Sequence, residues 1–228
     1  MTDRVPVIAI DGPTGSGKGT ISRSLAHKLG WHLLDSGALY RLVALIAAQK
    51  SIALDDQRGL AAAAADMVVN FSPAEDAEQV FLDGTDVTTQ LRTEEHAAAA
   101  SQVALLPLVR AALLLRQRAF AQPPGLVADG RDMGSVVFPD ATLKVYLTAT
   151  PKERALRRYN QLKEKGIDVS LPAVSREIAE RDERDANRKV APLKTAEGAQ
   201  VLDSTGITPE QVVARVHSWF AGLDQSAS

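Results

Sequence analysis

Residues 5–29 constrain the fold more than any other stretch, because they read as strand, glycine-rich loop and helix in that order. Residues 5–10 are apolar and mostly β-branched, which is typical of a buried strand. Four glycines follow within residues 12–19, and from Thr20 apolar side chains return at helical spacing. Glycines let consecutive backbone amides point into one concavity, and the following helix adds its positive end. The stretch therefore predicts a phosphate-binding loop with Lys18 as its mobile charge.

Lys18 is followed by Gly19, whereas phosphate-binding loops commonly place Ser or Thr directly after the lysine. The motif therefore does not place a hydroxyl ligand for Mg²⁺ there, and no metal-binding residue is singled out. The ion would be held by phosphates, water and a carboxylate. An ordinary glycine-rich turn is the alternative, but the flanking strand and helix favour the phosphate-binding loop.

Composition narrows the class of protein. The chain has 228 residues, 45% hydrophobic and 24% charged, which suits one globular core with a small insertion. A net charge of −2 disfavours nucleic acids and membrane surfaces as partners. The absence of cysteine excludes disulfides and thiolate metal sites. No apolar stretch approaches about 18 residues and no signal peptide is evident, so we expect a cytoplasmic protein.

Strand-like and helix-like segments alternate along the chain. This order predicts a three-layer α/β fold with a mostly parallel five-stranded sheet, whose binding sites lie beyond the carboxyl ends of the strands. The expected strands are residues 5–10, 31–34, 126–128, 143–147 and 201–202. The expected helices after the loop are residues 36–46, 57–67, 94–120 in two parts meeting near Pro107, and segments beginning near 152, 175 and 209.

One segment interrupts this alternation. Residues 68–89 contain short β-type runs and a hairpin-like Asp83-Gly84, with acidic side chains within residues 75–78. We interpret residues from about 66 to 100 as an insertion on the α/β core, and the whole chain, residues 1–228, as a single domain.

Two polar segments follow predicted strands. Residues 129–132 (Asp-Gly-Arg-Asp) close an apolar strand with a carboxylate, where proteins with phosphate-binding loops place an acid that faces metal or substrate. We expect Arg131 and Asp132 in a glycine-containing loop at the ligand-binding edge, and a functional role is favoured. Ser36, Tyr40 and Arg41 follow the second strand. As residues alone they are better explained as a helix cap and an exposed basic side chain.

Two further segments are rich in charge. Residues 152–165 hold six basic and two acidic side chains, which would suit a segment that closes over phosphates. A solvated basic helix face is nevertheless the favoured interpretation for most of them. Arg181, Asp185 and Arg188 would fall within about 60° of one another on a helix, which suits a phosphate and a sugar hydroxyl. Ordinary surface ion pairs explain that stretch equally well.

Several motifs together carry a resemblance to a known family. GPTGSGKGT at residues 12–20 resembles the phosphate-binding loop of nucleoside monophosphate kinases, in which Gly-Lys-Gly-Thr is the usual ending. The resemblance narrows to bacterial cytidylate kinases through DSGALYR (35–41), VFLDGTDVT (80–88), ASQVA (100–104), ADGRDMGSVVFPDA (128–141) and RDERDANRKVAPL (181–193).

This resemblance implies a monomeric, cytoplasmic enzyme that transfers the γ-phosphoryl group of ATP to CMP or dCMP, with Mg²⁺ and without nucleic acid or membrane partners. It implies that residues 66–100 bind the monophosphate and that residues 152–168 form a short helical lid. Its catalytic residues would be Lys18, Arg131 and Arg188. The implied ATP contacts are Gly12, Pro13, Thr14, Gly15, Ser16, Gly17, Lys18, Gly19 and Thr20.

The resemblance also implies a set of CMP contacts. By role they are Arg41, Arg131 and Arg188 for the acceptor phosphate; Arg181 and Asp185 for the ribose; Ser101, Arg110 and Asp132 for cytosine; and Ser36, Tyr40 and Asp129 as further pocket residues. Cytosine offers an amine donor at position 4 and an acceptor at ring N3, which match the carboxylate of Asp132 and the guanidinium of Arg110. Uracil reverses both patterns and would leave buried polar groups unpaired.

Three rival interpretations stay open from the residues. The first is a kinase for another acceptor, such as UMP, AMP or a small alcohol. The second is a nucleotide switch that acts through partners, although the chain contains no Asn-Lys-x-Asp motif for guanine. The third is an ATPase linked to nucleic acid, which the net charge of −2 disfavours.

Overall fold

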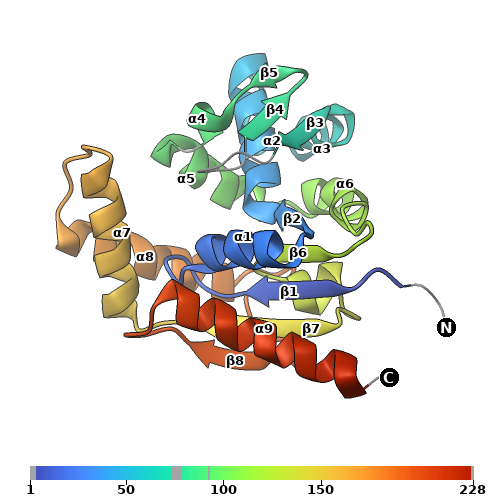
Figure 1. The fold of residues 1–228 in the computed structure, drawn as a ribbon. Helices are drawn as coiled ribbons and strands as arrows, with labels where there is room; N and C mark the ends of the chain where they lie inside the picture. The colour runs from blue at the N-terminus through green and yellow to red at the C-terminus, as the bar shows by residue number, and fades with distance from the viewer. Residues whose placement is uncertain (1–3, 73–78, 92, 227–228) are drawn as a thin grey trace. The chain divides into compact units, whose positions relative to one another are not determined.

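The computed structural model describes residues 4–72, 79–91 and 93–226. The chain forms two compact units, which we call the sheet unit (Met1–Asp35 and Arg118–Ser228) and the inserted unit (Ser36–Gln117). Figure 1 labels the elements of both units. The acidic cluster expected within residues 75–78 lies outside the described residues.

The sheet unit contains a five-stranded parallel sheet in the order β2-β6-β1-β7-β8. Every residue of β1 (Val7–Asp11) and β6 (Leu126–Gly130) is buried, as expected for central strands with both faces covered. β2 (His32–Asp35), β7 (Leu143–Thr148) and β8 (Gln200–Asp203) complete the sheet. The predicted mostly parallel five-stranded sheet is confirmed.

Two helices far apart in sequence pack together on this sheet. α1 (Lys18–Leu29) and α9 (Pro209–Ser226) contribute to one apolar core with the strands (Figure 1). Ile10 of β1, Leu25 of α1 and Val216 of α9 are completely buried in that core. Burial of each such side chain contributes about 1.5–3 kcal/mol, so this contact fixes the helix that follows the phosphate-binding loop.

The remaining elements of the sheet unit are a π-helix, η1 (Met133–Val137), and the paired helices α7 (Pro151–Glu164) and α8 (Leu171–Ala186). α8 begins four residues before its expected start near residue 175. The reason is a helix-start signal that the prediction overlooked: the Ser170 hydroxyl accepts the amide of Ala173, and a proline occupies the first turn.

The inserted unit combines helices with a small antiparallel sheet. Asp83 and Gly84 both have positive φ, 50° and 81°, which confirms the predicted hairpin turn between β4 and β5. The strands, in the order β3-β4-β5, are β3 (Val69–Ser72), β4 (Gln79–Leu82) and β5 (Thr85–Asp86). The helices are α2 (Ser36–Lys50), α3 (Gln57–Asp66), α4 (Thr88–Leu91), α5 (Glu94–Val103) and α6 (Pro107–Arg118).

Over the described ranges, no single helix has both the length and the apolar character needed to cross a membrane. The segments 95–103 and 107–118 meet the length and composition criteria only when taken together, and they are bent by 100°.

Candidate nucleotide-binding site

The glycine-rich loop joins the carboxyl end of β1 to the start of α1. Gly12 passes so close to β7 that a Cβ atom would overlap the carbonyl group of Leu147. Gly15 and Gly17 have positive φ, 77° and 93°, a backbone region that side chains disfavour. Because Gly17 caps α1 and has no side chain, the first amides of that helix keep their capacity to bind an anion.

Lys18 lies at the first position of α1, with its side chain folded back into the loop. The ammonium donates to the carbonyl of Pro13 at 2.9 Å and lies 3.5 Å from the Ser16 hydroxyl. Burial and the nearby Arg131 lower the pKa of Lys18 to about 7, although Asp129 and Asp11 partly offset this effect. The loop therefore holds a cation in a poorly hydrated position, where an incoming anion would stabilise it.

Three neighbouring strands each carry a carboxylate at their last or next-to-last residue, at this edge of the sheet. Asp35 of β2 pairs in register with Asp129 of β6, and Asp11 closes β1 beside them. Burial raises the pKa of Asp11 and that of Asp129 to about 6. Asp11 accepts the amides of Met133 and Gly134, both at 2.8 Å, and so holds the start of η1.

Arg131 links the loop to helix α8. Its Nε donates to Asp185 at 2.8 Å, and its Nη2 donates to the Thr14 hydroxyl at 2.8 Å. Burial alone would raise the pKa of Asp185, but the Arg131 guanidinium outweighs burial and holds that pKa below its usual value. The structure thus brings together three predicted site residues from distant parts of the sheet unit.

One placement expected at this edge is confirmed and one is wrong. Arg131 and Asp132 lie in the connection between β6, which ends at Gly130, and η1, which begins at Met133. Arg188 does not share a helix face with Arg181 and Asp185, because α8 ends at Ala186 and Asn187 caps it. Arg188 is nevertheless buried, and so is Asp132, at 8% and 4% exposure.

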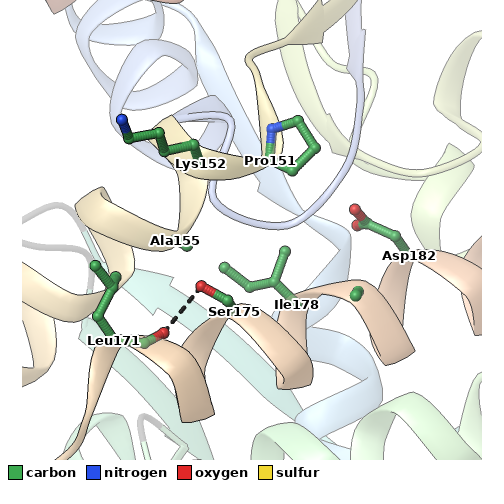
Figure 2. Close-up of a pocket in the computed structure, with 8 residues that line it drawn as sticks. Pro151, Lys152, Ala155, Leu171, Ser175, Ile178 and Asp182 are labelled. Carbon is green, nitrogen blue, oxygen red and sulfur yellow. Dashed lines mark hydrogen bonds between the residues drawn. The ribbon is translucent and has the colours of Figure 1, made fainter.

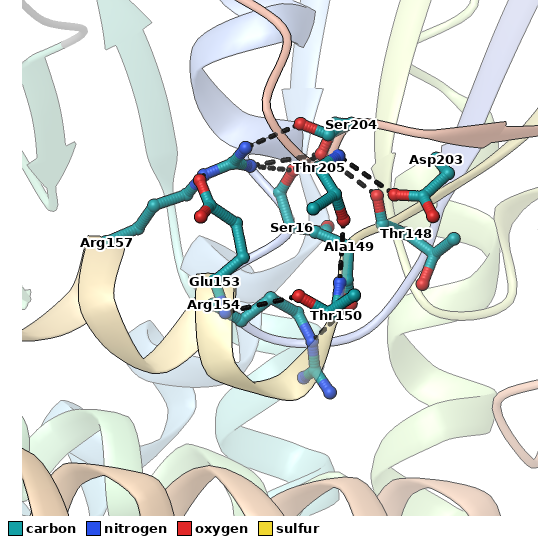
Figure 3. A network of polar contacts seen from close by, with 10 residues as sticks. All are labelled: Ser16, Thr148, Ala149, Thr150, Glu153, Arg154, Arg157, Asp203, Ser204 and Thr205. Atoms are coloured by element: carbon teal, nitrogen blue, oxygen red, sulfur yellow. Dashed lines mark hydrogen bonds and ion pairs between the residues drawn. The ribbon is translucent and has the colours of Figure 1, made fainter.

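The basic segment 152–165 is also not a uniformly solvated helix face. Arg154 is buried, and its Nη1 donates to the carbonyl of Thr14 at 3.0 Å. Arg157 donates to the carbonyl of Ser16 at 3.3 Å and to the carbonyl of Ser204 at 2.6 Å (Figure 3). Loop carbonyls need donors, and the start of α7 supplies them. Lys163 fits the expected solvated face, since it pairs with the exposed Asp168.

The inserted unit holds the other predicted CMP contacts. Arg110 of α6 is buried, donates to the carbonyl of Ala104 at 3.3 Å, and lies 5.8 Å from the centre of the Tyr40 ring. Ser36 and Tyr40 are buried on α2, while Arg41 is partly exposed. Ser101 is partly exposed on α5. Arg110 and Tyr40 therefore present a planar cation beside an aromatic ring.

A pocket of about 450 Å³ lies between α7 and α8 (Figure 2). Apolar side chains, including Ala155 and Ile178, line most of it, and Asp182 lies at one end. Asp182 accepts from Arg154 Nη2 at 2.6 Å. The pocket therefore borders the side chains that support the loop.

Within the described ranges, no group of three or more His, Cys, Asp or Glu side chains is arranged to hold a metal by itself. Asp129 offers a buried carboxylate whose pKa is raised by that burial. Mg²⁺ commonly uses one or two carboxylates together with substrate phosphates and water. The residues present fit an Mg²⁺ ion that arrives with a nucleotide.

Sequence reasoning missed several polar residues of this edge. Asp11 and Ser204 could have been identified from the sequence, because each polar residue lies at or just after the end of an apolar strand, where binding sites of parallel sheets occur. Arg154 and Asp182 could not, because Arg154 looked like part of a solvated basic helix face and Asp182 lay in a stretch that surface ion pairs explained equally well.

Comparison with known proteins agrees with the geometry. Residues 8–221 match the family described as cytidylate kinase. A cytidylate kinase from Azotobacter vinelandii is 57% identical over 226 residues, covering 98% of this chain and 99% of that protein. A cytidylate kinase from Aeromonas salmonicida is 55% identical over 216 residues, covering 95% and 94%.

Among solved structures, an uncharacterized protein from Eubacterium ventriosum has a TM-score of 0.52 at 10% identity, covering 95% of this chain and 98% of that one. That likeness concerns the fold alone. The sequence matches decide the family, and the resemblance seen in the motifs is confirmed: the chain belongs to the cytidylate kinase family.

Proposed function

We propose that this protein is a cytidylate kinase that transfers the γ-phosphoryl group of ATP to CMP or dCMP, giving ADP and CDP or dCDP. The observation that carries the proposal is the buried Lys18 inside a glycine-rich loop, at the start of α1, in a chain of this family. Loop amides, the helix start and Lys18 together match the β- and γ-phosphates of ATP.

The transfer needs no covalent intermediate with the protein. Lys18 neutralises charge on the transferred group, and Arg131 and Arg188 hold the acceptor phosphate and the transferring group. Arg131 is already oriented by Asp185 at 2.8 Å, so little reorganisation is required of it. Positioning, charge neutralisation and exclusion of water are sufficient chemistry for this reaction.

Base selection rests on Asp132 and Arg110. Asp132 accepts a hydrogen bond from the cytosine amine, and Arg110 donates to ring N3. The remaining predicted contacts, including Arg181 for the ribose, keep the roles that the family resemblance gives them. Residues 66–100 serve as the monophosphate-binding insertion and residues 152–168 as the lid.

Mg²⁺ is part of the proposal as a cofactor that arrives with ATP. Asp129, with the nucleotide phosphates and water, would hold it, and the ion would supply further neutralisation of phosphate charge. The proposed enzyme is a cytoplasmic monomer with no nucleic-acid or membrane partner.

The experiment is ADP formation from ATP and Mg²⁺ with CMP, dCMP, UMP, AMP or no acceptor, measured in parallel. Turnover confined to CMP and dCMP is expected. Turnover confined to UMP or AMP would keep the kinase and discard the cytosine assignments. ADP formation that does not depend on an acceptor would favour the nucleotide switch or the nucleic-acid-linked ATPase.

Asp132→Ala tests the base reader directly. Because the carboxylate matches cytosine and not uracil, the variant should lose more activity with CMP than with UMP. Comparison of kcat/KM for the two acceptors measures this, and an equal loss for both would remove Asp132 from base recognition.

A further inference from the structure

Two arginines of α7 donate hydrogen bonds to carbonyl groups of the phosphate-binding loop. Arg154 Nη1 lies 3.0 Å from the carbonyl oxygen of Thr14, and Arg157 Nη1 lies 3.3 Å from that of Ser16. The two arginines are three positions apart, so they project from one side of the helix. The arginines of α7 therefore contact every second carbonyl in this part of the loop, and a glycine follows each contacted carbonyl.

The direction of these carbonyls sets the direction of the next amides. In a planar trans peptide, the C=O of one residue and the N–H of the next point in opposite directions. The Arg154 guanidinium, by holding the carbonyl of Thr14, therefore turns the amide of Gly15 away from α7. The Arg157 guanidinium, by holding the carbonyl of Ser16, turns the amide of Gly17 away in the same way. Both glycines have positive φ, the backbone that lets successive amides converge on one anion.

The Arg157 guanidinium is occupied by protein acceptors on all three nitrogens (Figure 3). Nε donates to Glu153 at 2.9 Å, Nη2 donates to the Ser204 carbonyl at 2.6 Å, and Nη1 also lies 3.0 Å from the Ser204 hydroxyl. That hydroxyl lies 2.9 Å from the carbonyl of Thr148 and 3.2 Å from the carbonyl of Ser16, so its single proton serves both acceptors. Ser204 therefore approaches the same loop carbonyl that Arg157 contacts.

Protein acceptors also hold the guanidinium of Arg154 in place. Its Nε donates to the carbonyl of Ala149 at 3.1 Å, and its Nη2 pairs with Asp182 of α8 at 2.6 Å. The arginine is 5% exposed, and a Cβ atom on Gly15 would lie 3.0 Å from the Arg154 backbone. The loop is thus packed directly against the start of α7.

We propose that Arg154 and Arg157 are positioning residues that fix the phosphate-binding amides before nucleotide arrives, with Ser204 acting on the same carbonyl as Arg157. They act through Thr14 and Ser16, not by touching phosphate. The inference rests on the proposed ATP site, and it gives these residues of the basic segment a role distinct from that of Lys18.

The test measures ATP binding without acceptor, by isothermal titration calorimetry, for wild type, Arg157→Gln, Ser204→Ala and the double variant. A hydrogen bond to a charged group is worth enough that Arg157→Gln should raise the Kd for ATP about tenfold. Ser204→Ala should raise it about threefold. The double variant should raise the Kd by less than the roughly thirtyfold product of the two single effects, because both residues act on the carbonyl of Ser16.

Matched measurements separate positioning from other roles. The Kd for CMP and the unfolding temperature should stay close to wild type in all three variants. Arg4→Gln is the control, since it removes an arginine from the exposed pair with Asp140 and should leave ATP binding unchanged. Arg154→Lys, which keeps a charge facing Asp182, should weaken ATP binding about threefold to tenfold.

Different results overturn different claims. Wild-type ATP affinity in Ser204→Ala, together with weak binding in Arg157→Gln, would mean that Arg157 contacts phosphate itself. An equal loss of CMP affinity would mean general disruption of the fold. Normal ATP binding in every variant overturns this inference alone, whereas failure of the wild type to bind ATP overturns the proposed function with it.

Discussion

The two units hold their buried polar side chains in different ways. In the sheet unit, Lys18, Asp11 and Asp129 are close enough to alter one another's pKa, and their burial keeps that edge poorly hydrated. In the inserted unit, Arg110 is held by a backbone carbonyl and lies beside the Tyr40 ring. The first arrangement suits a highly charged phosphate group, and the second suits a flat, uncharged base.

The largest expected effect is that of Lys18→Ala. The variant should lose about 10³-fold in turnover with every acceptor, because the loop then lacks its cation for the transferred phosphoryl group. It should stay folded, since burial of the ammonium costs free energy in the folded state. ADP formation and circular dichroism measure the two quantities, and near-normal turnover would contradict the loop assignment.

Arg188→Lys should have the next largest effect, a drop of about 10- to 100-fold in kcat/KM for CMP. The lysine keeps the charge but loses the planar fork that binds phosphate through two parallel hydrogen bonds. Steady-state kinetics with CMP varied at saturating ATP measure the change. Unchanged kinetics would show that charge alone suffices at this buried position.

Arg110→Lys should act on the acceptor side only. We expect the KM for CMP to rise about tenfold while the KM for ATP stays unchanged, because a lysine lacks the flat guanidinium beside Tyr40. Kinetics with each substrate varied in turn provide the measurement. An equal rise in both KM values would contradict the assignment of base binding to the inserted unit and of phosphate binding to the sheet unit.

The smallest expected effect is an uptake of less than one proton when ATP binds at pH 8. In the free protein the pKa of Lys18 is about 7, so its side chain is mostly neutral at pH 8. Phosphate charge raises that pKa, and binding therefore takes up a proton. At pH 6 Lys18 is already charged, so its uptake disappears there.

Calorimetry of ATP binding in buffers of different ionisation enthalpy measures this proton count. Asp11 and Asp129, whose pKa values are raised to about 6, are ionised at pH 8 and contribute nothing there. Lys18→Ala is the control and should show no uptake at pH 8. Proton release by the wild type at that pH would contradict the sign of the pKa shift.

The phosphate-binding loop and the parallel sheet could be predicted from the sequence because their signals are local. A β-branched run, four glycines and a helical stripe lie within residues 5–29, and each later strand is a short apolar run ending in polar residues. The end of α8 could not be placed in this way. Spacing alone extended the helix to Arg188, whereas the capped helix ends at Ala186.

The sequence by itself determined the family, the order of strands and helices, and the residues available to bind phosphate. The tertiary structure decided which charged side chains of α7 lie in solvent and which support the loop. Arg154 lies 140 positions from Thr14 in the chain, so no local pattern distinguishes it from the solvent-exposed Lys163. The sheet brings α7 beside the phosphate-binding loop. The carbonyl groups of the loop need hydrogen-bond donors, and the nearest donors are the arginines at the start of α7.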